Sequence, residues 1–145
     1  MAVDLPDKIR NAIEGPQFWA LATTNPDGSP QVSTVWVKPK DGNILVNSAL
    51  GRKKPRNLER EPRVALSWVD PENGYHTASI QGRVVETYTG DEAEADIDSL
   101  AQKRGITGAD AYTAEWKWSD EQERDGSAHD VVAAVIAELE AKADW

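Results

Sequence analysis

Residues 17–47 read QFWALATTNPDGSPQVSTVWVKPKDGNILVN, and this stretch decides the fold. Three apolar segments, at 17–24, 30–38 and 43–47, are separated by the sequences NPDG and KDG. Asn, Pro, Asp and Gly favour tight turns, because they adopt or stabilise the backbone angles that turns require. Short apolar segments joined by such turns are typical of consecutive antiparallel hairpins.

Two further segments continue this pattern after an interruption. Residues 64–69 (VALSWV) and 76–87 (HTASIQGRVVET) both have strand-like composition, and Gly82 marks a bend or bulge in the second. Five strands at short spacing, linked mostly by hairpins, predict a mainly β protein built on a small antiparallel barrel with flanking helices.

The interruption, residues 51–63, reads GRKKPRNLEREPR and is rich in positive charge, although the whole chain has a net charge of -9. Pro55 suits the start of a helix, whose first amides are free donors and whose dipole favours an anion. The small polar residues Asn47 and Ser48 precede the run and allow close approach. We therefore predict a phosphate-binding site here, the alternative being a solvated basic helix that balances acidic neighbours. The basic residues are Arg52, Lys53, Lys54, Arg56, Arg60 and Arg63.

Helical patterns flank the predicted strands. A capping and apolar pattern predicts a helix from Asp4 to the stop at Gly15, with Pro6 in its first turn. Residues 91–104 predict a second helix, and residues 111–128 an ordered loop. The tail, 130–145 (DVVAAVIAELEAKADW), has helical composition, so we expect a helix from Leu139 onwards and leave residues 131–137 open between strand and helix.

The composition limits the possible classes of protein. A length of 145 residues predicts one domain, 1–145, in which 119–145 is an acidic extension of uncertain structure. The absence of cysteine excludes disulfides and thiolate chemistry. No apolar run is long enough for a membrane span and the N-terminus lacks signal-peptide features, so we expect a cytoplasmic protein with no membrane partner. Residues 91–145 carry a balance of -10, which argues against a nucleic-acid partner.

Few side chains are suited to acid–base or metal chemistry. His76 and His129 lie far apart without ligand-like spacing, so no metal site is predicted. The chain has neither a nucleophile motif of the G-x-S-x-G type nor a glycine-rich nucleotide motif. We identify no catalytic residue and expect a bound cofactor to carry the chemistry.

The order of these motifs resembles the FMN-binding split-barrel superfamily of pyridoxamine 5'-phosphate oxidase-like proteins, especially the flavin/deazaflavin oxidoreductases that use coenzyme F-420. The likeness covers roughly residues 5–118. It is carried by the segments FWALAT (18–23), NPDGSPQV (25–32), VWV (35–37), NS (47–48), RKKPRNL (52–58), PRV (62–64) and IQGRV (80–84).

The resemblance implies a split β-barrel homodimer with two cofactor sites at the interface. In this family Arg52 and Lys54 would hold the cofactor phosphate together with Asn57, and Ser48 would lie close by. The strand around Gln31 and Ser33 would run along the cofactor ring, with the side chains at its polar edge. Trp36 and Trp68 would form walls of the pocket, or else belong to the barrel core.

The activity implied is transfer of hydride from reduced F-420 to a small electron-poor organic acceptor. One alternative is an FMN-binding flavoprotein of the pyridoxamine-phosphate-oxidase type, and another is a protein that binds a flavin or deazaflavin without catalysis. Gly51 stands where the classical FMN oxidases carry a serine, which favours F-420. The family also ends with a strand that closes the barrel, whereas a helical tail here would leave closure to another segment.

Overall fold

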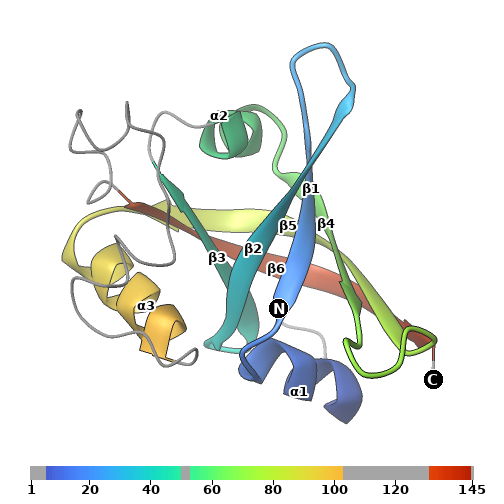
Figure 1. Cartoon of the computed structure of the whole chain (residues 1–145). Helices are drawn as coiled ribbons and strands as arrows, with labels where there is room; N and C mark the ends of the chain where they lie inside the picture. Colours follow the sequence, from blue (N-terminus) through green and yellow to red (C-terminus); the bar gives the residue numbers. More distant parts are fainter. Residues whose placement is uncertain (1–5, 50–52, 103–130, 145) are drawn as a thin grey trace, which may run out of the picture.

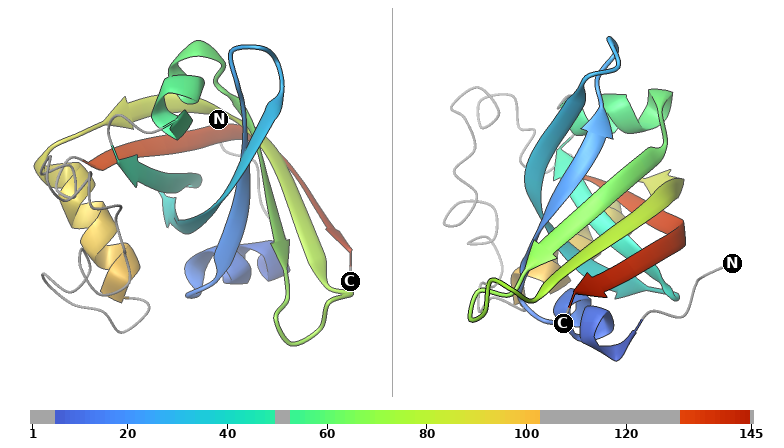
Figure 2. Two further views of the ribbon diagram at one scale, coloured as in Figure 1. Left: turned by 45° about the horizontal axis from the view of Figure 1, so that its top comes forward. Right: turned by 90° about the vertical axis from the view of Figure 1, so that its right-hand side faces the viewer.

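The computed structural model describes residues 6–49, 53–102 and 131–144. Within them, six antiparallel strands form a closed barrel in the order β1-β2-β3-β6-β5-β4, with one helix at each end and a third on the outside (Figures 1 and 2). The elements in chain order are α1 (Asp7–Glu14), β1 (Phe18–Thr24), β2 (Pro30–Lys40), β3 (Asn43–Ala49), α2 (Lys53–Arg60), β4 (Arg63–Val69), β5 (Thr77–Tyr88), α3 (Asp91–Gln102) and β6 (Val131–Asp144).

The sequence-based reading of the first five strands is confirmed, and the hairpins of residues 17–47 are formed as expected. The β1–β2 turn places Gly28 at φ 88°, where a side chain is strained. The register of β5 against β6 shifts between Gln81 and Arg83, so the irregularity expected at Gly82 is also present. Helix α1 begins after Pro6, which occupies the N-cap position without a side-chain cap; Asp4 and the loop expected at 111–128 lie outside the described residues.

The expectation of a helical tail is wrong. Residues Val131–Asp144 form β6, which pairs with β3 on one side and with β5 on the other and thereby closes the barrel. The tail's Ala, Glu, Leu and Lys residues favour helices in isolation, but they also alternate apolar and charged with a period of two from Ala137 to Asp144. Hydrogen-bond partners on both edges outweigh a propensity of a few tenths of a kcal/mol per residue.

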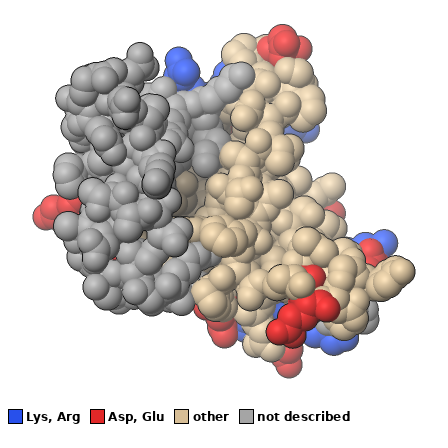
Figure 3. All heavy atoms as spheres, viewed as in Figure 1, with Lys and Arg blue, Asp and Glu red and all other residues tan. Residues whose placement is uncertain are grey.

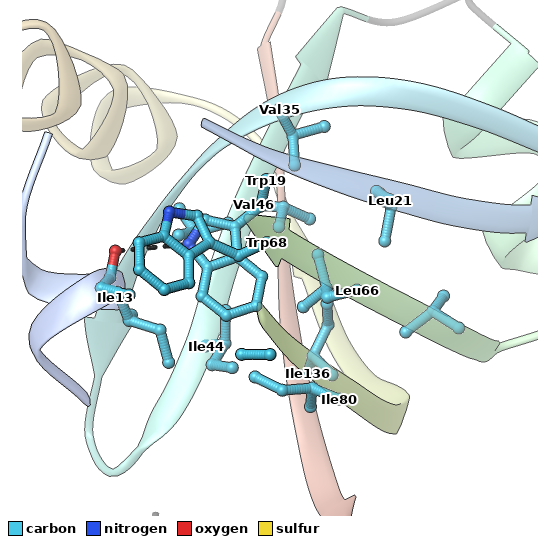
Figure 4. Packing of buried hydrophobic residues seen from close by; sticks show 14 of the residues in the cluster. Ile13, Trp19, Leu21, Val35, Ile44, Val46, Leu66, Trp68, Ile80 and Ile136 are labelled. Carbon is cyan, nitrogen blue, oxygen red and sulfur yellow. Dashed lines mark hydrogen bonds between the residues drawn. The ribbon is translucent and has the colours of Figure 1, made fainter. Parts of the chain in front are cut away.

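Most of the barrel interior is apolar, and its α1 end is sealed by aromatic packing. Trp19 and Trp68 stack with their ring centroids 6.1 Å apart (Figure 4). The indole of Trp19 donates to the carbonyl oxygen of Ala12 (3.3 Å), and that of Trp68 donates to Oε1 of Gln17 (3.3 Å). Of the two readings of Trp68, the structure therefore supports barrel core. The other large side chains buried in this core include Ile9, Ile13, Leu21, Ile44, Leu66, Ile80 and Ile136.

A second, smaller core lies outside the barrel, where α3 covers β2, β3 and β6. Trp36 of β2 contributes its largest side chain and is 7% exposed. Trp36 therefore wedges between the sheet and α3, whereas its neighbours Val35 and Val37 face the interior. The other members of this outer core are Leu45, Ala93, Ile97, Leu100 and Ala133.

Candidate functional site

The basic helix α2 lies at the end of the barrel opposite α1 (Figure 1), where it contacts β1 and β3. Its sequence explains this position, because Leu58 is buried in the barrel core while Arg56 and Glu59 on its other side are exposed. The helix thus follows β3 directly and caps the end of the barrel, as expected for the predicted strand-to-helix junction. Arg52 lies outside the described residues, and the side chain of Lys54 is likewise not described.

Asn57 is the polar residue that fixes α2 to the barrel. Its side chain is only 1% exposed, and its Nδ2 donates to Oγ1 of Thr23 and to Oδ1 of Asn25, both at 3.1 Å. Its Oδ1 accepts from Nη2 of Arg60 at 3.1 Å. Arg60 also donates to the carbonyl oxygen of Thr24. These contacts make Asn57 a structural anchor of the helix, and its predicted contact with a phosphate stays a prediction.

Gln31 and Ser33 have side chains on the inner face of β2. They pair with Thr23 and Leu21 of β1, and directly opposite residues on antiparallel strands share a face of the sheet. Ser33 Oγ is buried without a hydrogen-bond partner, and Gln31 is half-buried opposite Thr23. A ring placed on the outside of β2 would therefore meet the backbone of these two residues, and their predicted contact with a ring edge stays untested.

Asn47, near the end of β3, is the residue of this region whose chemistry is most unusual. It is 4% exposed, and its Nδ2 is buried without a hydrogen-bond partner. Its partner on β6 is Ala133, a member of the outer core, so Asn47 lies on the outer surface of the barrel. The next residue, Ser48, pairs with Val132. An unpartnered buried amide costs about 1–3 kcal/mol, which suggests that an acceptor is missing.

A network of charged residues fixes α3, and in the sequence its members are only separate charges without a motif. Asp96 of α3 is buried between two lysines of β2, with Lys38 Nζ at 2.6 Å and Lys40 Nζ at 2.8 Å, and it also accepts from the hydroxyl of Tyr88. Burial works to raise the pKa of Asp96, but the hydrogen bonds from both lysines and Tyr88 outweigh it and hold that pKa below its usual value. Burial and the hydrogen bond to Asp96 raise the pKa of Tyr88 to about 12.

A cleft of about 490 Å³ opens on the outer surface near the C-terminal end of α2. It runs over β1, β4, β5 and β6, and its charged residues are Arg63, Arg83 and Glu140. Glu61 lies beside it, and the hydrogen bonds from Arg63 lower the pKa of Glu61 to about 2. Among the described residues, no group of His, Asp and Glu is arranged to hold a metal ion.

Comparison with known proteins identifies the family. The family model for pyridoxamine 5'-phosphate oxidase matches residues 5–143, so the chain belongs to the pyridoxamine 5'-phosphate oxidase family. A pyridoxine/pyridoxamine 5'-phosphate oxidase of Rubrobacter xylanophilus is 29% identical over 138 residues, which cover 92% of this chain. The chain spans 57% of that relative's length.

Solved structures share the same fold. A protein named F-420 reductase superposes with a TM-score of 0.76 at 24% identity, covering 95% of this chain and 98% of its own. A conserved hypothetical protein from Mycobacterium tuberculosis has a TM-score of 0.61 at 23% identity, covering 98% and 85%. The predicted resemblance to the split-barrel family is confirmed. In the described part of the chain no helix is long and apolar enough to cross a membrane.

Proposed function

We propose that this protein is an oxidoreductase that binds reduced F-420 at the α2 end of the barrel and passes hydride to a small electron-poor organic acceptor. The observation that carries the proposal is the unpartnered amide of Asn47, which is buried immediately before the basic segment. A phosphate or a ring carbonyl is the acceptor that this amide lacks. The bound deazaflavin supplies the hydride, so the protein has to orient the cofactor and exclude water.

Three groups of residues would hold the cofactor. Arg52 and Lys54 would bind the phosphate through charge-assisted hydrogen bonds, with the hydroxyl of Ser48 as a neighbouring donor. Asn57 would act on this group by positioning, because its contacts with Thr23 and Asn25 fix α2, the helix whose first turn contains Lys54. The backbone of β2 would lie along the ring. Trp36 lies beneath α3 and supports the neighbouring part of β2.

We also propose a homodimer, which the exposed apolar side chains of the barrel support independently of the resemblance. The described tryptophans, Trp19, Trp36 and Trp68, are buried within their own chain. Large apolar side chains are instead exposed on the outer face of β1, β2 and β4: Phe18 is 54% exposed, Val32 62% and Val69 55%. Figure 3 shows the β1–β2 side of this face, where charged side chains lie mainly around the edges.

A second copy is the partner that suits the α1 end of this face, where Phe18 begins β1 and Val69 ends β4, because apolar side chains associate there without burying Arg63, which lies at the other end of β4. Sedimentation should then give about twice the chain mass of 15.9 kDa. A mass near 15.9 kDa at micromolar concentration would contradict the dimer.

An FMN-binding oxidase is the second candidate function. It is favoured by the name of the family and by the relative in Rubrobacter xylanophilus. Gly51, in place of the serine of the classical FMN oxidases, supports F-420 instead. Titration of the purified protein with F-420 and with FMN, followed by fluorescence, separates the two. We expect tighter binding of F-420; tighter binding of FMN would replace our proposal with the oxidase.

The role of Asn47 is tested on the same protein with a matched control. Asn47→Leu removes the unpartnered donor, and Asn43→Leu makes the same change at the other end of β3, where Oδ1 is also buried without a partner. We expect Asn47→Leu to weaken cofactor binding about tenfold while leaving apoprotein stability equal or higher, since an unsatisfied donor has gone. Asn43→Leu should leave binding unchanged. Equal cofactor binding by both variants would contradict the proposed role of Asn47.

Turnover is a separate test. Cofactor binding without turnover of any nitroaromatic or quinone acceptor would favour a non-catalytic binding protein.

A further inference from the structure

The cleft at the C-terminal end of α2 has a feature that the proposed cofactor site does not explain. Arg63 of β4 and Arg83 of β5 are direct cross-strand partners. Like charges directly opposite on neighbouring strands are destabilising. Arg63 and Arg83 therefore concentrate positive charge at the rim of a 490 Å³ cleft in a chain of net charge -9, and such a pair suits an anionic ligand.

The protein already places one carboxylate in this position. Glu61 accepts from Nε of Arg63 (2.8 Å) through Oε1 and from Nη2 (3.2 Å) through Oε2. The nearby charge of Arg83 also contributes to the lowered pKa of Glu61. Glu61 occupies the Nε–Nη2 edge of the Arg63 guanidinium and leaves the Nη1 side for another acceptor. The Arg63 side chain is 73% exposed, so a ligand can reach it.

The other residues that line the cleft indicate the chemistry of the rest of such a ligand. One row of residues crosses four neighbouring strands in the order Ala22, Ala65, Gln81 and Glu140. Small apolar side chains thus form one half of the row, and Pro30 lies at the same side of the cleft. Glu140 stands at the opposite side and repels a second anion. The volume is in the range of small-molecule sites.

We propose that this cleft binds an organic carboxylate, with one carboxylate group against Arg63 and Arg83 and an adjoining apolar part over Ala22 and Ala65. The site is separate from the predicted phosphate clamp, since Lys54 lies in the first turn of α2 and the cleft lies beyond the last residue of α2, whose 8 residues span about 12 Å. The carboxylate belongs either to a free substrate or to an appendage of the cofactor. Both sources present the same chemistry to the arginines.

The test uses the full chain labelled with ¹⁵N, with benzoate as the anionic probe and benzamide as its neutral counterpart. We expect benzoate to bind, with shifts centred on residues 63–65 and 81–83, and benzamide to bind at least fivefold more weakly. Arg83→Gln should weaken benzoate binding about fivefold to tenfold, whereas Lys142→Gln should have no effect, because Lys142 is exposed on β6 and does not line the cleft. Glu140→Gln should strengthen binding, because it removes the repelling charge.

The outcomes separate the proposal from its alternatives. Equal binding of benzoate and benzamide, shifts elsewhere in the barrel, or equal effects of Arg83→Gln and Lys142→Gln would overturn it. A second titration uses protein saturated with F-420. Exclusion of benzoate there assigns the cleft to the cofactor's own carboxylates, and simultaneous binding assigns it to a free substrate. Benzoate binding by protein that does not bind F-420 would leave this site standing while the proposed function fails.

Discussion

The two ends of the barrel are built from different chemistry. At the α1 end, Trp19 and Trp68 stack and α1 adds a face of Ile9, Ala12 and Ile13, all buried. The two indole N–H groups buried there both have hydrogen-bond partners. At the α2 end the interior becomes polar, with Thr23 and Asn57 buried and Ser33 Oγ unpartnered.

This difference indicates that the α1 end mainly stabilises the fold and that the α2 end mainly binds the ligand. Apolar burial stabilises a fold by about 25 cal/mol per Å² and does not require a ligand. Buried polar groups without partners reduce stability, and they persist where a ligand supplies the missing contacts. We therefore expect substitutions at the α1 end to change stability and substitutions at the α2 end to change binding.

The largest expected effect lies at the apolar end. Trp19→Ala removes a side chain that is 1% exposed and leaves Trp68 without its stacking partner, so it should lower the free energy of unfolding by about 3–5 kcal/mol. Urea unfolding measures this change, with Tyr75→Ala as the control because Tyr75 is 91% exposed. A loss below about 1 kcal/mol would show that the stack does not hold this end together.

The strongest effect on binding should lie at the basic segment. Arg52→Ala or Lys54→Ala removes a charge-assisted hydrogen bond to the cofactor phosphate, worth about 1.5–3 kcal/mol, which corresponds to about tenfold to hundredfold in affinity. The stability of the apoprotein should change little, because an unliganded basic cluster repels itself. Fluorescence titration measures the affinity; unchanged binding in both variants would exclude the phosphate clamp.

Asn57 should affect both stability and cofactor binding, because it anchors α2 without reaching the outside of the barrel. Asn57→Ala leaves Thr23 and Asn25 without their donor and should cost about 1–2 kcal/mol of stability, together with weaker cofactor binding. Glu59→Ala, an exposed neighbour on α2, is the control. If Asn57→Ala weakens binding but leaves unfolding unchanged, then Asn57 contacts the ligand and is more than an anchor.

The network around Asp96 tests whether ion pairs and hydrogen bonds stabilise the attachment of α3 as strongly as apolar packing stabilises the α1 end. The pKa of Asp96 is lower in the folded state than in the unfolded chain, so its contribution is fully present above the unfolded value of about 3.9 and is lost as pH falls through the folded pKa. Thermal unfolding between pH 6 and pH 2 should show this loss. Asp96→Asn should reduce it, and Asp98→Asn on the same helix should not.

The smallest effect concerns long-range charge at the α2 end. F-420 carries a polyanionic glutamate tail, which should avoid the acidic C-terminal half and follow the basic side from Arg52 to Arg63. Its affinity should fall as salt rises, because exposed charges are screened over about 8–10 Å at physiological ionic strength. FMN has no such tail and should respond less. An F-420 affinity that is independent of salt would remove the electrostatic reason to prefer it over FMN.

Local sequence was sufficient for much of this structure. The turns at 25–28 and 40–42, the first five strands and α1, α2 and α3 follow from signals carried by neighbouring residues, and the predicted positions agree with the structure. The order of the motifs was also sufficient to find the family. These features depend on turn chemistry, on residue periodicity and on capping, which all act over a few residues.

Other features of the protein were decided only by the tertiary structure, because they depend on which distant strands pair and in which register. Pairing with β3 and β5 turned the tail from 131 to 144 into a strand against its helical propensity. Register directed Ser33 into the barrel and placed Asn47 on its outside without a hydrogen-bond partner for its amide. It also set Arg63 opposite Arg83, although they are 20 residues apart in the sequence. A single-residue shift reverses every side chain of a strand, so no local signal contains this information, and only the closed barrel supplies it.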